Sequence, residues 1–368
     1  MTNLAIVHEW LNVYGGSERL LAEILALYPR AELHALIHNP RNLIGTPLEG
    51  RAVTTTFLQK IPRVEHLYRG LLPLMPFAIE SLNVRDHHVV LSVSHAVAHG
   101  VKTTPDQIHI AYICTPMRYA WHLQDDYLRL HHLDKPFLGF AARVTLGLLR
   151  RWDASAAARA DHLLAISAWT ASRVLAAWGR EAHVIHPPVD VERFDFTKPR
   201  EDFYLVVSRL VPYKMTALIV EAFNHLNLPL VVVGDGPELP RLQKMAGANV
   251  KLLGHQPDEV VEDLMSRARA FVHMAVEDFG IAMVEAQAAG CPVIAFTKGG
   301  AAEIVLDGET GALVESQSVE ALIEAVRGFG SGVTRWDASA MHANASRFSR
   351  QRFREEFAAF MRPFLDGA

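Results

Sequence analysis

The sequence predicts an α/β protein with two parallel-sheet domains, and three observations support this class. Short apolar runs alternate with helical patterns along the chain, as they do in βαβ units. The chain has 368 residues, whereas a single hydrophobic core stops growing at about 250–300 residues. Hydrophobic residues make up 50% of the chain and charged residues 21%, which is the profile of an ordinary globular protein.

The apolar runs of the first half predict six strands, and a helix is expected directly after the first of them. The strands are at 4–7, 32–37, 89–92, 109–113, 162–166 and 183–185. The helix is expected over 18–27, with Ser17 as its N-cap. The proline-rich stretch from 186 to 190, and the charged residues that follow it as far as 202, indicate a linker between domains.

The second half repeats the alternation strictly, which predicts a second parallel sheet. Its strands are expected at 203–208, 230–234, 250–253, 270–274 and 293–296. Its helices are expected at 215–225, 237–246, 258–267 and 282–289, and a helix-like run with aromatic and basic residues closes the chain at 347–364.

Composition narrows the class of protein. The formal net charge of −4 argues against a general nucleic-acid binder, which is usually strongly basic. Two cysteines, Cys114 and Cys291, suit a reducing compartment and provide neither a disulfide framework nor a zinc site. The N-terminus becomes polar too soon for a signal peptide, and no apolar stretch reaches the ~20 residues of a membrane-spanning helix. A cytoplasmic protein is expected.

Two segments combine bulky apolar residues with basic ones, at 57–77 and 137–152. Helices of this kind can lie in a membrane interface or receive a lipid-linked substrate, although most are amphipathic core helices. Peripheral contact with the inner membrane is therefore left open beside the ordinary interpretation.

The functional hypothesis is centred on two glutamates, Glu277 and Glu285, which flank the entry to a predicted helix. Glu277 follows a buried strand, Gly280 stands at the helix entry, and Glu285 is expected in the first turn. Open α/β sheets bind ligands at such strand ends. A carboxylate repels an anion, but it can accept hydrogen bonds from the hydroxyls of ribose and hexose rings. A sugar-containing ligand is therefore favoured. The alternative is that one glutamate caps the helix and the other is a surface charge.

A basic pair follows the first strand of the second half. Ser208 and Arg209 leave this strand, and Lys214 stands just before a helix. Arginine offers a forked pair of donors and lysine a point charge, a combination that suits a diphosphate. Exposed loop charges are the alternative. Gly254 ends another strand of this half, where backbone can pass close to a ligand.

Loops after strands of the first half hold further candidates. Gly15 and Gly16 follow the first strand and allow backbone to approach a phosphate, with a plain tight turn as the alternative. His95 and His99 stand four apart, but no third metal ligand is near in sequence. An acceptor-site or capping histidine is therefore favoured over a metal pair. Thr115 and Arg118 follow the next strand and are candidate sugar-binding or acceptor-binding residues.

These residues, taken in order, resemble glycosyltransferase family 4, a group of retaining GT-B glycosyltransferases, over nearly the whole chain. The resemblance is carried by Glu277-x7-Glu285 around Phe279-Gly280-Ile281, by Gly-Asp-Gly-Pro at 234–237, by Arg209 with Lys214, and by Gly15-Gly16-x-Glu18. The stretches 94–101 and 115–121 are similar to those of bacterial polysaccharide and O-antigen enzymes, many of which are mannosyltransferases that use GDP-mannose.

The resemblance implies a GT-B fold of two Rossmann-like domains facing a central cleft. It places an acceptor-binding domain at 1–188, a nucleotide-sugar donor domain at 189–345, and a final helix at 346–368 that crosses back to the first domain. It implies a hexosyltransferase that carries mannose to a lipid-linked saccharide in cell-surface polysaccharide synthesis. Neither a cofactor nor a metal is expected.

The resemblance also implies residue roles. The catalytic residues would be Glu277, Arg209 and Lys214. Arg209 and Lys214 would bind the donor diphosphate, and Gly15 and Gly16 would approach it from the first domain. Glu285 would hold the ribose. The transferred sugar would be held by Glu277 together with the backbone of Phe279, Gly280, Ile281 and Ala282.

The chain departs from the family pattern at two positions. Cys114 stands where members commonly have a sugar-contacting histidine, and His122 stands where they have an aspartate. His95 is a candidate substitute for the missing histidine. A UDP-sugar donor, a sugar-nucleotide epimerase and a non-catalytic saccharide-binding subunit are the alternatives. A Rossmann dehydrogenase is disfavoured, because no strand is followed by G-x-G-x-x-G with a distant acid.

Overall fold

The computed structural model describes residues 3–121, 124, 128, 136–330 and 336–366. The chain divides into two compact units. Unit 1 comprises Met1–Pro187 and Phe353–Ala368, and unit 2 comprises Pro188–Arg352. His122 lies outside the described residues.

Unit 1 contains a parallel sheet of seven strands in the order β3-β2-β1-β4-β5-β6-β7. The six predicted strands are present, and β3 is an addition. Its three residues, Val-Thr-Thr, are too few to show a period in the sequence. The strands are β1 (Leu4–Leu11), β2 (Glu32–His38), β3 (Val53–Thr55), β4 (Val89–Ser94), β5 (Ile108–Ile113), β6 (His162–Ala165) and β7 (His183–Val184).

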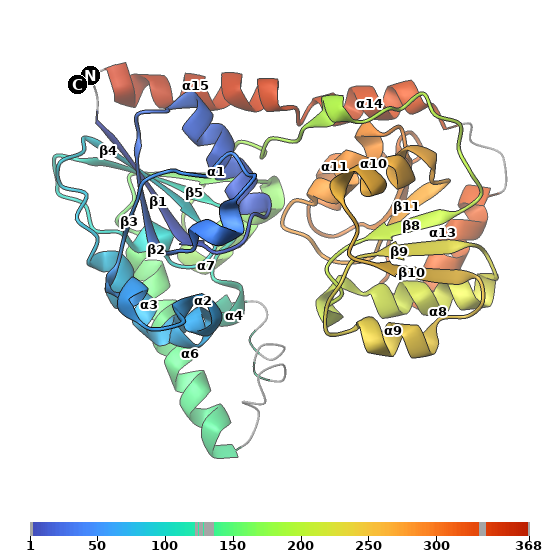
Figure 1. Cartoon of the computed structure of the whole chain (residues 1–368), viewed down its shortest axis with the longest axis horizontal. Helices are drawn as coiled ribbons and strands as arrows, with labels where there is room; N and C mark the ends of the chain where they lie inside the picture. Colours follow the sequence, from blue (N-terminus) through green and yellow to red (C-terminus); the bar gives the residue numbers. More distant parts are fainter. Residues whose placement is uncertain (1–2, 122–123, 125–127, 129–135, 331–335, 367–368) are drawn as a thin grey trace. The chain divides into compact units, whose positions relative to one another are not determined.

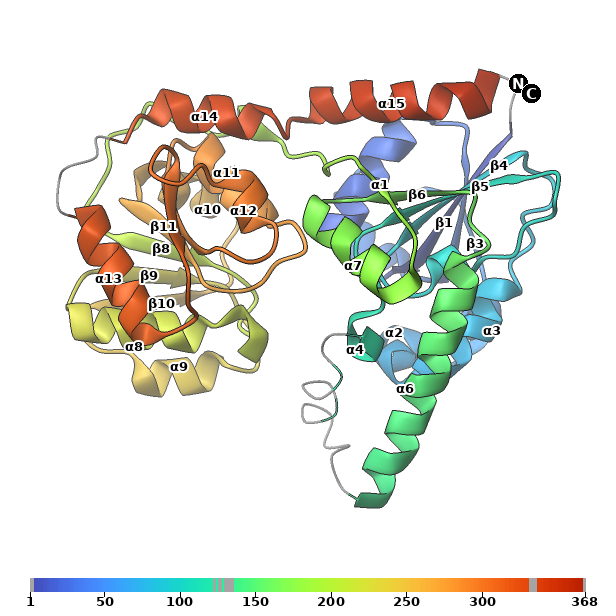
Figure 2. The same cartoon turned by 180° about the vertical axis from the view of Figure 1, so that it is seen from behind.

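Helices cover both faces of this sheet, as a parallel sheet requires. Figures 1 and 2 show α1 and α15 over one face and α2, α3 and α6 over the other. The helices are α1 (Gly16–Leu27), α2 (Val64–Leu67), α3 (Met75–Glu80), α4 (Arg118–Trp121), α6 (Pro136–Ala157), α7 (Ala168–Trp178) and α15 (Arg350–Asp366). Short 3-10 helices are η1 (Pro40–Leu43), η2 (Phe57–Lys60), η3 (Tyr68–Leu74) and η4 (Ala98–Gly100).

The start of α1 differs from the prediction. The N-cap is Gly15 and not Ser17, and the Glu18 carboxylate accepts the N–H of Gly15 at 2.9 Å. A glutamate at the third helical position can satisfy the first N–H in this way, so the helix can begin two residues earlier.

Unit 2 contains a parallel sheet of six strands in the order β10-β9-β8-β11-β12-β13. The five predicted strands are present, and β13 is an addition whose middle residues are only half buried. The strands are β8 (Tyr204–Val207), β9 (Leu230–Val233), β10 (Val250–Gly254), β11 (Ala270–His273), β12 (Val293–Phe296) and β13 (Gly311–Val314).

The helices of unit 2 also lie on both faces of their sheet. Figures 1 and 2 show α8, α9 and α13 over one face and α10, α11 and α14 over the other. They are α8 (Thr216–Leu226), α9 (Leu239–Met245), α10 (Asp258–Arg267), α11 (Ile281–Ala288), α12 (Ala301–Ile304), α13 (Val319–Gly330) and α14 (Ala338–Ser346), with 3-10 helices η5 (Val191–Arg193) and η6 (Pro212–Lys214). Because α11 begins at Ile281, Glu285 lies in its second turn and not its first.

The last helix, α15, supplies part of the core of unit 1 from the other end of the chain. Phe353, Phe357 and Met361 are fully buried. The Phe357 ring stacks on Tyr112 of β5, with 6.0 Å between ring centroids. No helix in the described ranges has the length and apolar character needed to cross a membrane.

Both sheets have a point at which the strand order reverses. In unit 1 this switch point lies between β1 and β4, and in unit 2 it lies between β8 and β11. The loops that leave neighbouring strands there run to opposite faces of the sheet, which opens a crevice at the carboxyl ends of the strands. The strand order therefore points to these two places as candidate sites.

Candidate functional site

At the switch point of unit 2, a mostly buried carboxylate meets a lysine and a histidine. Oε1 of Glu277 forms an ion pair with Nζ of Lys214 and lies 3.3 Å from Nε2 of His273. Lys214 comes from the loop after β8, whereas His273 is the last residue of β11. The structure thus brings together Lys214 and Glu277, two of the three predicted catalytic residues.

The Glu277 carboxyl remains ionised in this setting. Burial alone would raise its pKa, but the charge of Lys214 and the hydrogen bond and charge of His273 hold the pKa well below its usual value. An ionised carboxylate beside a cation can accept hydrogen bonds from neutral hydroxyls.

Two glycines hold the Glu277 backbone against the next loop. The N–H of Gly300 donates to the carbonyl of Glu277 at 2.9 Å. Gly299 has φ +93°, and a Cβ at this position would lie 2.5 Å from the carbonyl oxygen of Glu277. Only glycine fits at Gly299, so this loop fixes the main chain that carries the carboxylate.

Arg209, the third predicted catalytic residue, is exposed and lies on the same loop as Lys214. Its guanidinium donates to the hydroxyl of Tyr213 and lies 5.9 Å from the centroid of that ring. No ion pair with an acid is found for Arg209 among the residues that the structure describes. Its charge is therefore available to an anion.

The rest of the predicted phosphate loop is built on close backbone contacts. Ser208 directly follows β8, and its N–H donates to the carbonyl of Val233 at 3.1 Å. Gly234 has φ +139°, and a Cβ there would lie 1.8 Å from the carbonyl oxygen of Ser208. The glycine of the 234–237 turn thus packs against the loop that carries Arg209. Gly254, with φ +69°, accepts the N–H of Gly234 at 2.8 Å.

Residues 279–282 form the entry to α11, where helix N–H groups have no partner within the helix. Gly280, with φ +111°, is the N-cap, and Ile281 and Ala282 are the first helical residues. The Phe279 side chain is buried and packs edge-on against Phe348. A ligand role for this segment would thus fall to its backbone.

Glu285 has an arginine partner that the sequence did not indicate. Nη2 of Arg193 donates to Oε1 of Glu285 at 2.7 Å, and Nη1 of Arg193 lies 3.0 Å from Oε1 of Glu262. Arg193 therefore joins Glu285 of α11 to Glu262 of α10. Its predicted role at a ribose stays a prediction, and any ribose contact must coexist with or displace Arg193.

At the switch point of unit 1, a fully buried carboxylate organises the loop after β4. The four backbone N–H groups of residues 95–98 donate to Oε1 of Glu9 at 2.8–3.0 Å. The Ser94 hydroxyl donates to the same oxygen at 2.9 Å. The other oxygen, Oε2, lies 2.9 Å from Nδ1 of His95. Glu9 thus positions His95, the candidate acceptor-site histidine.

A second histidine connects this group to the glycine loop. Nδ1 of His8 lies 3.1 Å from the carbonyl of Val93 and its Nε2 lies 3.1 Å from Oε1 of Glu18. Both ring nitrogens face acceptors, which favours the imidazolium. Burial would lower the pKa of His8, but the hydrogen bond and charge of Glu18 outweigh burial and raise it. Because Glu18 also accepts the N–H of Gly15, the loop Gly15-Gly16 is joined to this network.

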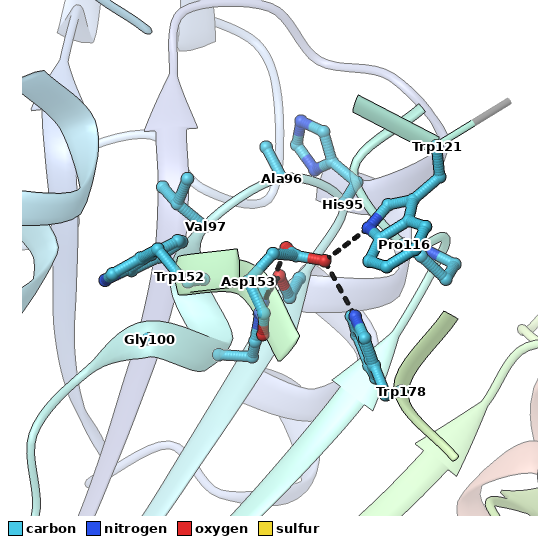
Figure 3. Close-up of polar contacts among 12 residues, drawn as sticks. His95, Ala96, Val97, Gly100, Pro116, Trp121, Trp152, Asp153 and Trp178 are labelled. Atoms are coloured by element: carbon cyan, nitrogen blue, oxygen red, sulfur yellow. Dashed lines mark hydrogen bonds and ion pairs between the residues drawn. The ribbon is translucent and has the colours of Figure 1, made fainter. Parts of the chain in front are cut away.

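A second buried carboxylate, Asp153 of α6, supports the same edge of unit 1. Figure 3 shows it between the indoles of Trp121 and Trp178. Both indole N–H groups donate to Oδ2 of Asp153 at 2.7 Å, and Nε2 of His99 lies 3.3 Å from Oδ1. His99 and His95 therefore turn to different carboxylates, and the structure does not bring them together as a metal pair.

The loop after β5 lies beside the loop of His95. The N–H of Cys114 donates to the carbonyl of Ser94 at 2.7 Å. Thr115 is buried, with its hydroxyl on the carbonyl of Pro116, and Arg118 is the first residue of α4. Cys114 is half buried and is not part of a disulfide. His95 thus stands on a neighbouring loop of the same sheet edge as the cysteine that replaces the expected histidine.

A polar cavity of about 540 Å³ opens near the carboxyl ends of β1 and β2 in unit 1. Its carboxamides are cross-linked: Oδ1 of Asn12 accepts from Asn39 at 3.2 Å, and Asn42 donates to the Asn12 carbonyl at 2.8 Å. Gln59, Glu65 and Arg41 also line it. A cavity of this size with amide and charged groups fits a small polar ligand.

Four residues that sequence reasoning did not assign shape these sites: Glu9, Asp153, Arg193 and His273. Glu9, Asp153 and His273 stand in or beside apolar runs. Burying a charged or titratable side chain in such a run costs free energy unless it has a partner. That cost is the signal that could have marked them. Arg193 gave no such signal, because it stands in a charged linker.

Comparison with known proteins finds a family match in the second half of the chain. Residues 189–332 match the model described as glycosyl transferases group 1. A GDP-mannose-dependent alpha-(1-6)-phosphatidylinositol monomannoside mannosyltransferase of Mycolicibacterium smegmatis is 34% identical over 199 residues, covering 45% of this chain and 52% of the relative. A GDP-mannose-dependent monoacylated alpha-(1-6)-phosphatidylinositol monomannoside mannosyltransferase of Corynebacterium glutamicum is 33% identical over 196 residues. This match covers 45% of this chain and 51% of the relative. The matches thus span about half the length of these curated relatives.

Solved structures share the fold of the chain. Anabaena HepE in complex with UDP superposes with a TM-score of 0.73 at 20% identity, covering 98% of this chain and 100% of HepE. The predicted fold class is confirmed: two parallel-sheet α/β units of the GT-B type.

Proposed function

We propose that this chain, in which residues 189–332 are a domain of the glycosyl transferases group 1 family, is a retaining glycosyltransferase. It transfers a hexose from a nucleotide donor to a lipid-linked saccharide during synthesis of a bacterial cell-surface polysaccharide. The observation that carries the proposal is the mostly buried group of Lys214, Glu277 and His273 at the switch point of unit 2. It combines a cation for phosphate with an ionised carboxylate for sugar hydroxyls.

The cations of the loop after β8 act on the leaving group. Negative charge develops on the nucleoside diphosphate as the sugar departs. Arg209 is exposed without an acid partner among the described residues, and Lys214 is mostly buried beside Glu277. Fixed cations aimed at developing charge need no reorganisation during the reaction, which makes this kind of stabilisation large. The proposed reaction uses no divalent metal.

Glu277 acts on the transferred sugar. Its ionised carboxylate accepts hydrogen bonds from hexose hydroxyls, and its charge favours the cationic character that the sugar ring acquires. The N–H groups of Ile281 and Ala282 at the start of α11 supply the donors that complete this subsite. Glu285 holds the ribose from the next turn of the same helix.

GDP-mannose is the favoured donor, because the two relatives described above are named as GDP-mannose-dependent. HepE was solved with UDP, which makes a UDP-sugar the second candidate. Binding to the native state raises thermal stability, so a thermal-shift screen of GDP, UDP and ADP and their sugars distinguishes the donors. A larger shift with GDP-mannose than with any UDP-sugar is expected.

The acceptor is assigned to unit 1. Its cavity is lined by the carboxamides of Asn12, Asn39, Asn42 and Gln59, which can both donate to and accept from saccharide hydroxyls. His95 lies at the switch point of the same sheet. We assign His95, with Thr115 and Arg118, to the contact with the acceptor or the transferred sugar.

Exposed apolar side chains of unit 1 suit a lipid-linked acceptor at a membrane surface. Phe140, Val144 and Leu148 recur at a spacing of four on α6 and are 72%, 48% and 60% exposed. Phe77 of α3 is another exposed aromatic side chain of unit 1, at 69%. Arg143 and Arg151 are exposed on the same helix. An apolar stripe with flanking cations can enter the interface of an anionic bilayer.

The test is product formation measured by mass spectrometry. Purified protein is incubated with GDP-mannose in the presence and in the absence of the acceptor, a polyprenyl-diphosphate-linked saccharide. A product heavier by one hexose, lost in Glu277→Ala, supports the proposal. The proposal fails if no nucleotide sugar is hydrolysed or transferred and Glu277→Ala behaves like the wild type. Donor binding without turnover would identify a non-catalytic subunit, and a changed sugar configuration on the nucleotide would identify an epimerase.

A further inference from the structure

A second cluster of histidines lies at the opposite edge of the unit 1 sheet, at the amino ends of β2 and β4. Glu32 and His34 are two positions apart on β2, so their side chains share one face of the sheet. His87 stands just before β4. Oε2 of Glu32 lies 3.3 Å from Nε2 of His87 and 4.0 Å from Nε2 of His34. One ligand atom from each of the three residues lies within 4.8 Å of the other two.

Both imidazoles are buried, and Nε2 of each ring has no hydrogen-bond partner among the described residues. His34 is 2% exposed and His87 is 4% exposed. Neither ring nitrogen of His34 has a hydrogen-bond partner among the described residues, and the same holds for Nε2 of His87. Buried ring nitrogens are normally satisfied. One unsatisfied Nε2 from each ring, both beside the Glu32 carboxylate, indicates a ligand that the two imidazoles share.

The main chain holds His87 in the orientation that a metal ligand needs. Its Nδ1 lies 3.4 Å from the carbonyl of Val84. If Nδ1 donates there, the lone pair of Nε2 points at Glu32. The side-chain amide of Gln107 donates to the carbonyls of Val84 and His87 at 2.6 and 2.5 Å and fixes this turn. Metal-bound histidines commonly give their second N–H to a backbone carbonyl in this way.

The third member of the cluster can adjust its position. Glu32 is more than half exposed, so its carboxylate can turn toward an ion held by the two imidazoles.

We propose that Glu32, His34 and His87 form a site for a zinc ion. Two imidazoles and a carboxylate are an ordinary Zn²⁺ ligand set, with solvent as the fourth ligand. Bonds of about 2.0–2.1 Å in a tetrahedron place ligand atoms about 3.3–3.4 Å apart. The 3.3 Å between Oε2 of Glu32 and Nε2 of His87 has this value. The 4.0 Å between Oε2 of Glu32 and Nε2 of His34 needs a contraction of about 0.6–0.7 Å, which the exposed Glu32 side chain can supply.

The zinc ion would fasten the start of β2 to the turn before β4. It would lie at the amino ends of the strands, the edge opposite to the switch point, so its role is to stabilise unit 1 and not to take part in transfer. The other group of three, His8, Glu9 and His95, is unsuited to a metal, because both nitrogens of His8 are already hydrogen-bonded. The sequence did not indicate the zinc cluster because its histidines come from distant segments.

The test is zinc binding by the full chain. Protein made metal-free with EDTA is titrated with Zn²⁺ against a chromophoric chelator. One equivalent should bind with a Kd below about 1 µM. In His34→Gln and His87→Gln the affinity should fall more than about 100-fold, since losing even an outer partner of a metal ligand costs about 10- to 100-fold. His66→Gln is the matched control, because His66 is 78% exposed and outside the cluster.

Two further measurements keep the proposal testable if a histidine variant folds poorly. Glu32→Gln changes an exposed side chain, and its zinc affinity should fall at least about 10-fold. Co²⁺ bound to the wild type should show the visible absorption of a tetrahedral nitrogen and oxygen site, displaced by Zn²⁺. Zinc should raise the Tm of the wild type and of His66→Gln but not of His87→Gln. No zinc binding at micromolar concentration, or equal binding in all variants, would overturn the site.

Discussion

Nδ1 of His95 lies 2.9 Å from Oε2 of Glu9, although Glu9 lies on β1 and His95 lies in the loop after β4. The other oxygen of Glu9 holds the backbone of residues 95–98. One buried carboxylate therefore sets both the position of the loop and the charge beside its histidine. Burial would raise the pKa of Glu9, but His95, His8 and the N–H of Ala98 lower it well below its usual value.

Replacing Glu9 should unfold unit 1 more easily. Glu9→Ala leaves five donors without an acceptor, and loss of one member of a buried charged network typically costs about 3–5 kcal/mol. Glu9→Gln keeps an acceptor oxygen and should cost less. Urea denaturation followed by far-UV circular dichroism measures both. Equal stability of Glu9→Ala and wild type would show that water replaces the carboxylate without loss.

Stability should depend on pH through His109, a fully buried histidine of β5 whose Nε2 lies 2.9 Å from the Ser92 hydroxyl. Burial, with the charges of His99, Arg159 and Arg180, lowers its pKa to about 3. Between about pH 6.5 and pH 3 the unfolded chain binds a proton that the folded chain does not. The free energy of unfolding therefore falls as pH falls through this window, by up to about 1.4 kcal/mol per pH unit.

The control for this pH dependence is His109→Gln, which keeps a polar group near Ser92 but does not titrate. Its unfolding free energy should change less between pH 6.5 and pH 4 than that of the wild type. Parallel curves for the two proteins would mean that His109 is already protonated in the folded state.

Lys214 and Glu277 should be coupled in activity. Each of Lys214→Ala and Glu277→Ala should lower kcat about 10²- to 10³-fold, the usual cost of removing one electrostatic group from a preorganised site. The double variant should lose less than the product of the two effects, because each single change leaves its partner unpaired. Lys251→Ala, an exposed lysine on β10, is the control. Strictly multiplicative losses would mean that the pair does not act as a unit.

Arg193 should affect nucleotide binding through Glu285. If Glu285 binds the ribose, Glu285→Gln should weaken GDP binding about 10-fold, the loss of a charge-assisted hydrogen bond of roughly 1.5 kcal/mol. Arg193→Ala should change GDP affinity as well, since Arg193 donates to the same carboxylate. Isothermal titration calorimetry gives the Kd of each variant. If both variants lose stability while their Kd for GDP is unchanged, Glu285 serves only the fold.

Asp153 should be needed for the position of Trp121 and Trp178. Asp153→Leu removes the acceptor of two indole N–H groups and should cost about 3 kcal/mol or more, because both are left without a partner. Asp153→Asn keeps one acceptor oxygen and should cost less. The near-ultraviolet circular dichroism of the tryptophans should change in both. An unchanged aromatic spectrum in Asp153→Leu would contradict the role assigned to this carboxylate.

Most of the fold was predictable because strands buried on both faces of a parallel sheet read as continuous apolar runs. The exceptions are β3, with three residues, and β13, whose middle residues are half exposed. Helix starts were less predictable. Helix α1 begins at Gly16 because the Glu18 carboxylate accepts the N–H of the N-cap Gly15. Helix α11 begins at Ile281 because Gly280, in the left-handed region, is its N-cap.

The candidate site was predictable where a residue type and its place after a strand coincide, as for Lys214 and Glu277. Partners were not predictable, because they depend on which segments the fold brings together. Arg193 reaches Glu285 from the linker, and His273 turns from the end of its own strand to Glu277. The donors to Glu9 likewise come from a distant segment, the loop after β4. A sequence shows that a buried charge needs a partner but not which residue supplies it.

Unit 1 is assembled from both ends of the chain, and this affects the order in which the protein can fold during synthesis. Phe357, which stacks on Tyr112, leaves the ribosome only after the whole of unit 2 has been made. Unit 2 is continuous from Pro188 to Arg352 and can close as soon as it emerges. The half of the protein that is translated first is therefore the half that is completed last. Until α15 is made, the face of Tyr112 that Phe357 covers stays without this partner in the nascent sheet of unit 1.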